Sequence, residues 1–334
     1  MSNSIPFVER DSPLVSICIP IYGVEQYIER CARSVFEQTY LNIEYIFVND
    51  NTKDRSVEIL TGVMNDYTER LSAIRIISHE KNRGLAAARN TAIENCSGVF
   101  VMNVDSDDYL EKNAVELLMN RQKETGADIV SGCAIKETNH GQEVLREPDY
   151  KSKEEMILSC IRPTLDHMWR RIIRLSLYKE NHIAAKEGVN VGEDWQVLPQ
   201  LVYFAKKIAK IDDIVYHYNC MNESSYMSQK KQSFNRIIAD QDFQSLEIVE
   251  NFFMDKDIQY QRTIMSFKGG FYEHYLTAAY KAKDAYYYNL IANKILAIDK
   301  LYLAKIGWNK FKIRLINRNY FNRRFFDLFF SLVH

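Results

Sequence analysis

The first third of the chain alternates short apolar runs, rich in β-branched residues, with stretches whose apolar residues recur every three or four positions. The runs have the length and composition of buried strands, and the stretches between them have the periodicity of helices. The predicted strands are Leu14–Ile19, Ile43–Val48, Ala73–Ile77 and Val99–Val104, and the predicted helices are Val24–Gln38, Asp54–Glu69 and Leu85–Asn95. Strands and helices in this order predict a parallel sheet with right-handed crossovers.

The later part of the chain continues this pattern and then becomes mostly helical. A helix at Glu111–Glu124 and a strand at Asp128–Gly132 follow, and a strand-like run lies at Asp213–Tyr218. Residues 231–334 contain no proline and are rich in Tyr and Phe, which favours helices. We therefore predict an α/β domain followed by a helical C-terminal region, with these bounds: 13–225 and 226–334.

Composition narrows the class of protein. The 334 residues include 43 Lys and Arg against 44 Asp and Glu, a net charge of -1, so we expect no nucleic-acid partner. The six cysteines lack metal-ligand spacing and fit a reducing compartment. The sequence shows neither a secretory leader nor an apolar stretch long enough to span a membrane. These features favour a cytoplasmic protein.

Acidic residues gather where the predicted strands end, which is where open parallel sheets bind ligands. Asp50 follows the second strand, and Asp105 and Asp107 follow the fourth. Asp105 and Asp107 lie on one side of an extended segment, because side chains alternate in direction. A carboxylate cluster is costly without a cation or donors, and hard oxygen ligands suit Mg²⁺ or Mn²⁺ bridging to phosphate. The alternative is a solvated turn before the helix at Glu111.

The segment Asn82–Asn90, NRGLAAARN, combines a loop glycine, a helix start made of small residues, and Arg89. A helix that begins at Gly84 or Leu85 could direct free N–H groups at a ligand anion, and the alanines would let the backbone approach closely. Arg89 would then contact a phosphate or one of the acidic residues. The alternative is an Ala-rich helix packed on the sheet, with Arg89 in a structural ion pair.

Three motifs together carry a resemblance to a known family: VSICIPIYGVEQYIERCARSVFEQTYLNIEYIFVNDNTKDRS, NRGLAAARNTAI and GVFVMNVDSDDYL. Their order, spacing and strand context resemble the glycosyltransferase family 2 catalytic domain over residues 13–115, and more weakly to about residue 225. Members share the GT-A fold, a mostly parallel, Rossmann-like sheet flanked by helices. The resemblance implies an inverting, metal-dependent enzyme that moves a sugar from a nucleotide-sugar donor, a UDP-sugar, to a saccharide or lipid-linked acceptor. Such an enzyme would serve cell-surface polysaccharide or glycolipid synthesis.

The resemblance also implies roles for individual residues on the donor side, which it places in 13–115. Pro20 and Tyr22 would line the nucleotide pocket, and Asp50 would hydrogen-bond the base, a uracil. Asp105 would lie near the ribose and the metal, and Asp107 would bind the metal directly. Arg89 is included as a candidate nucleotide contact.

The sequence departs from the family's usual pattern in two places. Where Asp-Asp-Gly-Ser is common, this chain has Asn49-Asp50-Asn51-Thr52, and it has Gly23 where an asparagine is usual. Asn51 can take the left-handed conformation that glycine would supply, so Asp50 remains a candidate. The contact made by the usual asparagine stays open.

In the acceptor half, 116–225, an acidic pair supplies the catalytic base of such enzymes. The pair here is in VGEDWQ, and its second member, Asp194, is the predicted base, with Glu193 as the alternative. A carboxylate in this place would remove the acceptor hydroxyl's proton as that oxygen attacks the anomeric carbon. The pair could instead cap a helix. Trp169 is a core or acceptor-pocket residue, and His167 and His217 are structural residues or contacts to metal or phosphate.

Other functions fit parts of this pattern. A Rossmann-type oxidoreductase needs a Gly-rich turn after the first strand, which PIYGVEQY lacks. A nucleotide-sugar-binding protein that has lost transfer activity would lack the metal or base carboxylate, whereas both Asp107 and Asp194 are present. A nucleotidyltransferase also uses sugar, nucleotide and metal, and it would release pyrophosphate instead of a nucleoside diphosphate.

The C-terminal segment Lys305–His334 departs from the neutral balance of the chain. It has seven basic residues and no acidic one as far as Arg324, and an aromatic, apolar end follows. This pattern is typical of an in-plane helix on an anionic membrane surface, which would make the protein peripheral on the inner membrane face. The alternative is a helix that packs on the catalytic domain or on a second subunit.

Overall fold

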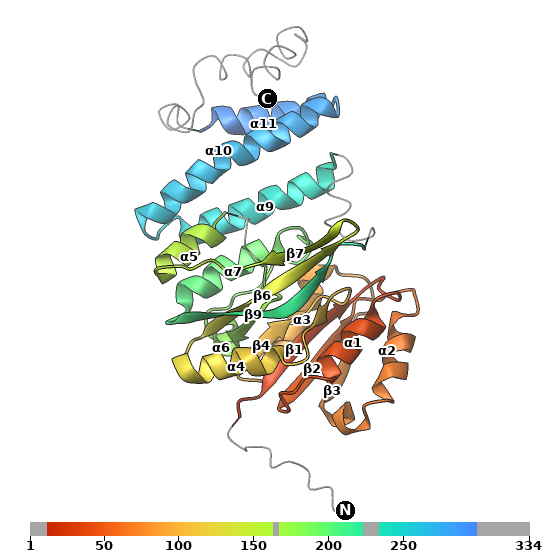
Figure 1. Ribbon diagram of the computed structural model, residues 1–334. Coiled ribbons are helices and arrows are strands. Elements are labelled where there is room, and N and C mark those ends of the chain that lie inside the picture. The colour runs from red at the N-terminus through yellow and green to blue at the C-terminus, as the bar shows by residue number, and fades with distance from the viewer. Residues whose placement is uncertain (1–11, 163–166, 223–233, 299–334) are drawn as a thin grey trace, which may run out of the picture.

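A computed structural model describes residues 12–162, 167–222 and 234–298. Its centre is a nine-stranded sheet in the order β3-β2-β1-β4-β8-β6-β9-β5, with β7 paired to β6. Helices cover both faces of the sheet, so the predicted α/β fold is confirmed (Figure 1). The strands are β1 (Val15–Ile21), β2 (Ile43–Asn49), β3 (Ile74–Ser78), β4 (Phe100–Asn103), β5 (Tyr109–Leu110), β6 (Ile129–Thr138), β7 (Gly141–Leu145), β8 (Arg171–Arg174) and β9 (Ile208–Asn219).

The first four strands form the parallel part of the sheet. The chain runs outward from β1 to β2 and β3, and then returns to place β4 on the other side of β1. The strand order therefore reverses between β1 and β4, and ligands bind outside the carboxyl ends of strands at such a reversal. Asp105 follows β4 and Tyr22 follows β1, so both lie at this point.

The other half of the sheet is mixed. β8 runs antiparallel between β4 and β6, so β6 points the same way as β4, and β9 is parallel to β6. The carboxyl end of β9 therefore reaches the same edge of the sheet as that of β4. β5 and β7 are antiparallel additions to β9 and β6.

The strand β8 was not predicted, because its sequence reads as charged. Arg170 and Arg171 are 1% and 0% exposed, and both contact the buried carboxylate of Glu147. The apolar pair between the flanking arginines of β8 packs in the core. Glu147, the ion-pair partner, lies 24 residues from Arg171 in the chain, so no local pattern in the sequence marks this strand as buried.

Two hydrophobic cores fill the faces of the sheet. One lies under α1, α2 and α4, and the other lies under α3, α5, α6 and α7. Each apolar strand run supplies residues to both cores, because successive side chains face opposite ways. The helices are α1 (Ile28–Phe36), α2 (Ser56–Met64), α3 (Leu85–Glu94), α4 (Ala114–Thr125), α5 (Lys153–Cys160), α6 (Leu175–Glu180) and α7 (Glu193–Phe204), with a 3-10 turn at Thr68–Ala73.

The described part of the C-terminal region, residues 234–298, is helical as predicted, with helices α9 (Arg236–Phe253), α10 (Ile258–Lys281) and α11 (Ala285–Leu296) stacked beyond α5 and α7 (Figure 1). The core under α3, α5 and α7 continues into these helices without a break. Trp195 of α7 packs edge-on against Phe267 of α10, with 5.5 Å between ring centroids. The helix that begins with the predicted catalytic pair is therefore anchored on its far side by the C-terminal helices.

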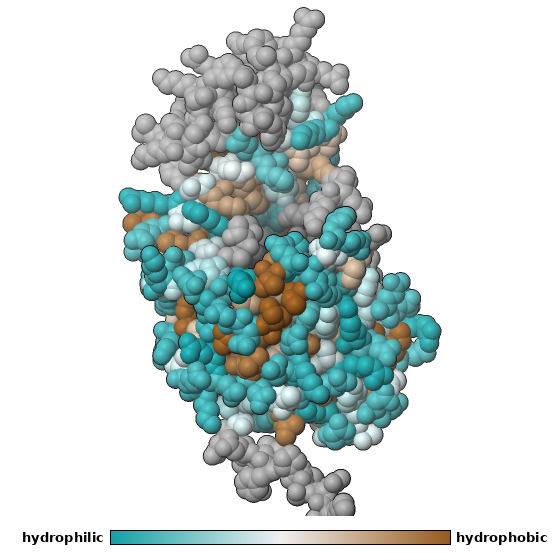
Figure 2. All heavy atoms as spheres, viewed as in Figure 1, coloured by the Kyte–Doolittle hydropathy of each residue, from teal (hydrophilic) through white to brown (hydrophobic). Residues whose placement is uncertain are grey.

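Most of the surface seen in Figure 2 is hydrophilic, with an apolar patch over the strands β6, β7 and β9. Val144 of β7 is 47% exposed. Within the described parts of the chain, no helix has the length and apolar character needed to cross a membrane. The segment Lys305–His334 lies outside the described residues.

Candidate active site

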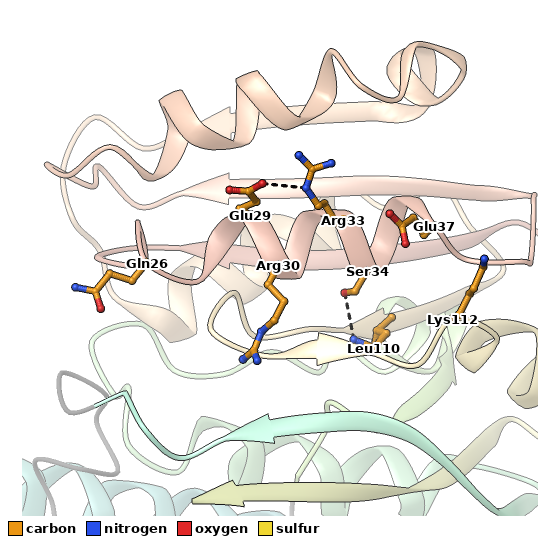
Figure 3. A pocket seen from close by; sticks show the side chains of 8 residues that line it. All are labelled: Gln26, Glu29, Arg30, Arg33, Ser34, Glu37, Leu110 and Lys112. Carbon is orange, nitrogen blue, oxygen red and sulfur yellow. Dashed lines mark hydrogen bonds and ion pairs between the residues drawn. The ribbon is translucent and has the colours of Figure 1, made fainter. Parts of the chain in front are cut away.

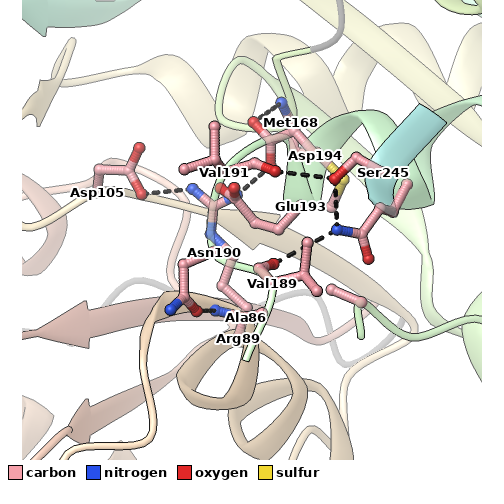
Figure 4. Close-up of polar contacts among 12 residues, drawn as sticks. Ala86, Arg89, Asp105, Met168, Val189, Asn190, Val191, Glu193, Asp194 and Ser245 are labelled. Atoms are coloured by element: carbon pink, nitrogen blue, oxygen red, sulfur yellow. Dashed lines mark hydrogen bonds and ion pairs between the residues drawn. The ribbon is translucent and has the colours of Figure 1, made fainter. Parts of the chain in front are cut away.

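Arg89 joins the two halves of the candidate site (Figure 4). It projects from α3, is 6% exposed, and its guanidinium bonds Asp105 after β4, at 2.7 Å, and Glu193 at the start of α7, at 3.0 Å. The same nitrogen that contacts Glu193 also contacts Asp194. Of the two contacts predicted for Arg89, the structure therefore contains the one to acidic residues.

Three carboxyl groups around one guanidinium leave an excess of negative charge. Burial raises the pKa of Glu193 to about 8, and the neighbouring Asp194 adds to this despite the opposing charge of Arg89. Burial also raises the pKa of Asp194, with Arg89 again opposing. Burial alone would lower the pKa of Arg89, but the charges of Asp105, Asp194 and Glu193 raise it, so Arg89 stays protonated. Perturbed groups of this kind gather at functional sites.

Asp194 is oriented as well as buried. Its Oδ2 accepts a hydrogen bond from the backbone N–H of Met168 at 3.3 Å, while Oδ1 faces Arg89. Glu193 begins α7, next to Gly192 in the left-handed region at φ 75°. Both acidic residues thus lie at a helix N-terminus, where the helix dipole favours the ionised carboxylate.

Backbone N–H groups of the turn before α3 and of its first residues donate to side-chain oxygens of the protein. Asp50 accepts hydrogen bonds from the backbone N–H groups of Arg83 at 2.8 Å and Gly84 at 2.7 Å, and it lies 2.7 Å from Nδ1 of His79. Asn190 accepts from the N–H of Ala86 at 3.1 Å. The N–H groups of Arg83, Gly84 and Ala86 are therefore not free for an anion, because carboxylate and amide oxygens of the protein already bind them.

Gly84 is required at this turn for two reasons. Its φ of 89° lies in the region that favours glycine, and an added Cβ would come within 2.3 Å of the Asn190 side chain. The neighbouring turn after β2 also needs a positive φ, and Asn51 adopts it at 57°, as the sequence suggested. The loops after β2 and before α3 are therefore fixed by specific backbone conformations.

Asp105 and Asp107 lie together on the turn that follows β4. Burial raises the pKa of Asp107 to about 6, and the charge of Asp105 adds to this. A divalent cation would relieve that repulsion, and carboxylate oxygens are the ligands that Mg²⁺ and Mn²⁺ prefer, so these residues fit such an ion. Among the described residues, no group of three or more His, Cys, Asp or Glu side chains could hold a metal alone. Phosphate oxygens would have to complete the coordination.

The other predicted contacts occupy different environments. Pro20 is buried at the end of β1, beyond the last residue that pairs with β4, so its missing N–H costs no sheet hydrogen bond. Tyr22 is 55% exposed and free to stack on a ligand. Trp169 is 3% exposed and stacks between His167, at 4.8 Å, and Tyr216, at 4.4 Å, so it is a core residue.

The two histidines differ in their surroundings. Burial lowers the pKa of His167 to about 4, and the nearby charges of Arg170 and Arg171 add to this. A neutral imidazole results at physiological pH. His217 stacks on Tyr109 with 4.2 Å between ring centroids and lies 2.7 Å from a carboxylate oxygen of Glu111. The described partners of His217 thus give it a structural role beside β5.

A separate groove lies between α1 and the segment from Leu110 to Lys112 (Figure 3). Its charged lining residues pair with neighbours of the same surface: Arg33 bonds Glu29 at 3.0 Å, and Arg30 lies 4.1 Å over the ring of Tyr109. None of the predicted site residues lines this groove, so it is distinct from the candidate site.

Four residues of the site were missed by the sequence analysis: Asn190, Tyr216, Asn219 and Asn222. Asn190 binds the start of α3, and the other three bind the turn from Asp105 to Asp108 from the end of β9 and the residues after it. The rule that selected the residues after β4 would also select the end of β9, once β9 is known to run parallel to β4. For Asn190 we find no signal in the sequence.

The sequence is similar to that of known glycosyltransferases. Residues 16–184 match the family described as Glycosyl transferase family 2. The uncharacterized glycosyltransferase EpsJ of Bacillus subtilis (strain 168) is 31% identical over 227 residues, which are 64% of this chain and 64% of that protein. The chain therefore matches less than two thirds of this relative's length.

Two solved structures resemble the chain at low identity. S. aureus TarS 1-349 in complex with UDP-GlcNAc is 20% identical with a TM-score of 0.56, over 83% of this chain and 90% of that one. The mannosyltransferase PcManGT from Pyrobaculum calidifontis, in complex with GDP-Man and Mn²⁺, is 16% identical with a TM-score of 0.57, over 89% and 84% of the two chains. At such identities the likeness concerns the fold.

Proposed function

The chain belongs to glycosyl transferase family 2, and we propose that it transfers a sugar from a nucleoside-diphosphate donor to an acceptor hydroxyl, with inversion at the anomeric carbon. The observation that carries this proposal is the position of Arg89 between Asp105, on the donor side, and the Glu193-Asp194 pair. The donor-side carboxylate and the predicted base, far apart in sequence, thus share one guanidinium. A single displacement needs a base and a leaving-group site this close together.

Asp194 is the proposed base. A group that takes a proton at neutral pH must be ionised, and the ion pair with Arg89 favours the ionised form of Asp194. Glu193 is the weaker candidate, because a pKa of about 8 leaves it protonated at neutral pH. The N–H of Met168 holds the second oxygen of Asp194, so one edge of the carboxylate has a fixed orientation.

On the donor side we propose Pro20, Tyr22 and Asp50 as contacts of the nucleotide, with UDP as the nucleotide. Asp105 and Asp107 would hold Mn²⁺ or Mg²⁺, which stabilises the charge of the departing diphosphate when bound. The nucleotide sugars in the two similar structures, and the Mn²⁺ in one of them, support a donor and metal of this class. The exposed ring of Tyr22 supports a stacking contact to the base.

The decisive experiment is a screen of UDP- and GDP-sugars with Mn²⁺ or Mg²⁺ and saccharide or lipid-linked acceptors, which measures released nucleoside diphosphate. Acceptor-dependent release of UDP, lost on chelation, would support the proposal. Release of pyrophosphate would favour a nucleotidyltransferase, and donor binding without turnover would favour a binding protein. Product configuration, measured by NMR, tests inversion: an α-linked product from an α-linked donor would contradict it.

We propose that the product enters cell-surface polysaccharide or glycolipid, and that the protein acts beside the inner face of the membrane. The basic and aromatic composition of Lys305–His334 supports this attachment. Sedimentation with anionic liposomes, comparing the full chain with one that ends at Ala304, tests it. Equal recovery of both in the supernatant at low salt would leave packing or self-association as the role of this segment.

A further inference from the structure

The turn that carries Asp105 and Asp107 is tied to the end of β9 by a buried tyrosine. Tyr216 is fully buried, and its hydroxyl donates to Oδ2 of Asp108 at 2.7 Å. The same hydroxyl accepts the backbone N–H of Asp105 at 3.1 Å. Asp108 is 1% exposed, and its own N–H donates to the carbonyl of Asp105 at 3.0 Å. One phenol thus connects the first and last residues of the turn.

Two asparagines complete the attachment. The N–H of Asn219 donates to Oδ1 of Asp108 at 2.7 Å, and its side-chain amide donates to the carbonyl of Asp107 at 3.2 Å. Asn222 donates to Oδ2 of Asp107 at 2.8 Å. Both oxygens of Asp108 are therefore occupied by β9, whereas the contact with Asn222 engages one oxygen of Asp107.

The tyrosine is itself held in place. Its ring stacks on Trp169 with 4.4 Å between centroids and 23° between planes. Rotation of the ring would break this contact, so the position of the hydroxyl is fixed relative to the sheet. The turn needs such a restraint, because Asp105 and Asp107 carry like charges that favour its opening.

We propose that Tyr216 and Asp108 are positioning residues that hold the carboxylates of Asp105 and Asp107 in the geometry for a divalent cation. This inference rests on the proposed function, since it assigns the cation to that turn. Neither residue is expected to touch substrate, because the two oxygens of Asp108 and the phenol are already bonded within the protein. Partners of metal ligands commonly set affinity in this way.

The test compares Tyr216→Phe with Tyr45→Phe. Tyr45 is also fully buried, and its hydroxyl has no hydrogen-bond partner among the described residues, which makes it a matched control. In the ligand-free protein, we expect Tyr216→Phe to speed hydrogen exchange in residues 105–108 by roughly tenfold, as for loss of a hydrogen bond to a charged group. Tyr45→Phe should leave that exchange unchanged.

The second readout is the affinity for Mn²⁺ alone, measured by calorimetry or electron paramagnetic resonance. We expect Tyr216→Phe to weaken it by roughly tenfold or more. Asp108→Asn, which keeps the shape but replaces one of the two acceptor oxygens by an amide nitrogen, should do the same if Tyr216→Phe folds poorly. A lower Tm with unchanged exchange at 105–108 and unchanged Mn²⁺ affinity would make Tyr216 a core residue only and overturn the proposal.

The two readouts separate this proposal from the proposed function. Hydrogen exchange needs no ligand, so a faster exchange supports the restraint even if the chain transfers no sugar. A wild-type chain that binds neither Mn²⁺ nor a nucleotide would contradict the proposed function and the role in cation binding, whereas a normal wild type with unaffected variants would contradict the positioning role alone.

Discussion

Aspartates follow both β2 and β4 at the same edge of the sheet, but their surroundings are opposite. Asp50, after β2, receives two backbone N–H groups and lies beside a histidine. Asp105 and Asp107, after β4, neighbour other carboxyl groups, and burial and like charge raise the pKa of Asp107. The first site is complete without a ligand. The second keeps an electrostatic cost that a divalent cation would remove.

A carboxylate at a strand end is therefore not by itself evidence of a catalytic or ligand-binding role. What distinguishes the two sites is whether the protein supplies the donors. Arg89 is shared among Asp105, Glu193 and Asp194, so one positive charge opposes three carboxyl groups. A buried excess of charge lowers stability, so its presence is explained by a functional requirement. The following variants should separate the two kinds of site.

The largest expected effect comes from Asp107→Asn. Loss of this charged ligand should lower metal-dependent turnover on the order of 10³-fold, since the metal contributes several kcal/mol to the transition state. The Tm should stay the same or rise, because the variant removes a buried charge near Asp105. Turnover at saturating Mn²⁺ and thermal unfolding measure the two effects. Wild-type turnover would contradict the assignment.

Asp194→Asn should have the next largest effect. We expect transfer to slow by about 10²-fold or more, as for loss of a general base, while titration with UDP and Mn²⁺ gives nearly the wild-type affinity. This pattern would separate it from Asp107→Asn, which should weaken the metal-dependent binding. If Asp194→Asn kept full activity, Glu193 would become the candidate base.

Asp50→Asn should affect stability more than chemistry. The amide nitrogen of the variant would face a backbone N–H, and we expect a loss of about 2 to 3 kcal/mol in the free energy of unfolding. Chemical denaturation at pH 7 measures this, with Asp107→Asn as the contrasting variant. If Asp50 also binds the base, UDP affinity should fall in addition. Unchanged stability would mean that its three contacts contribute little.

The smallest expected change concerns how stability varies with pH. The pKa of Glu193 is about 8 in the folded chain against an ordinary value of 4.5, so the folded state holds this proton more tightly. Its contribution to stability is fully present below pH 4.5 and is lost as the pH rises through 8. Between pH 5 and 8, the free energy of unfolding should therefore fall more steeply in the wild type than in Glu193→Gln. Parallel curves would contradict the raised pKa.

Much of the first half of the fold could be predicted from the sequence. The runs that became β1, β2 and β4 are continuous and β-branched because both their faces are buried, and parallel strands show this pattern. Each of the four strands predicted in the first third of the chain overlaps its observed counterpart to within two residues at either end. Asp105 and Arg89 were selected by the same reasoning, because their positions follow from the order of strands and helices.

The second half could not be predicted in the same way. β7 is largely exposed and has no apolar run, and β8 begins beside Arg170 and Arg171, which are buried only because Glu147 meets them. The contact between Arg89 and Asp194 spans 105 positions in the sequence. A contact of that separation depends on how α7 packs against the sheet, and periodicity carries no information about it.

The separation between Arg89 and Asp194 also has a consequence for synthesis of the chain. A ribosome adds residues at about 5 to 20 per second, so roughly 5 to 20 seconds pass between the appearance of Arg89 and that of Asp194. During this interval the arginine can pair with Asp105 but has neither member of the Glu193-Asp194 pair. The nascent sheet therefore carries a cation that it cannot yet bury with its full set of partners. The contacts of Arg89 are therefore completed only after translation of α7, so the late half of the chain completes a site that the early half begins.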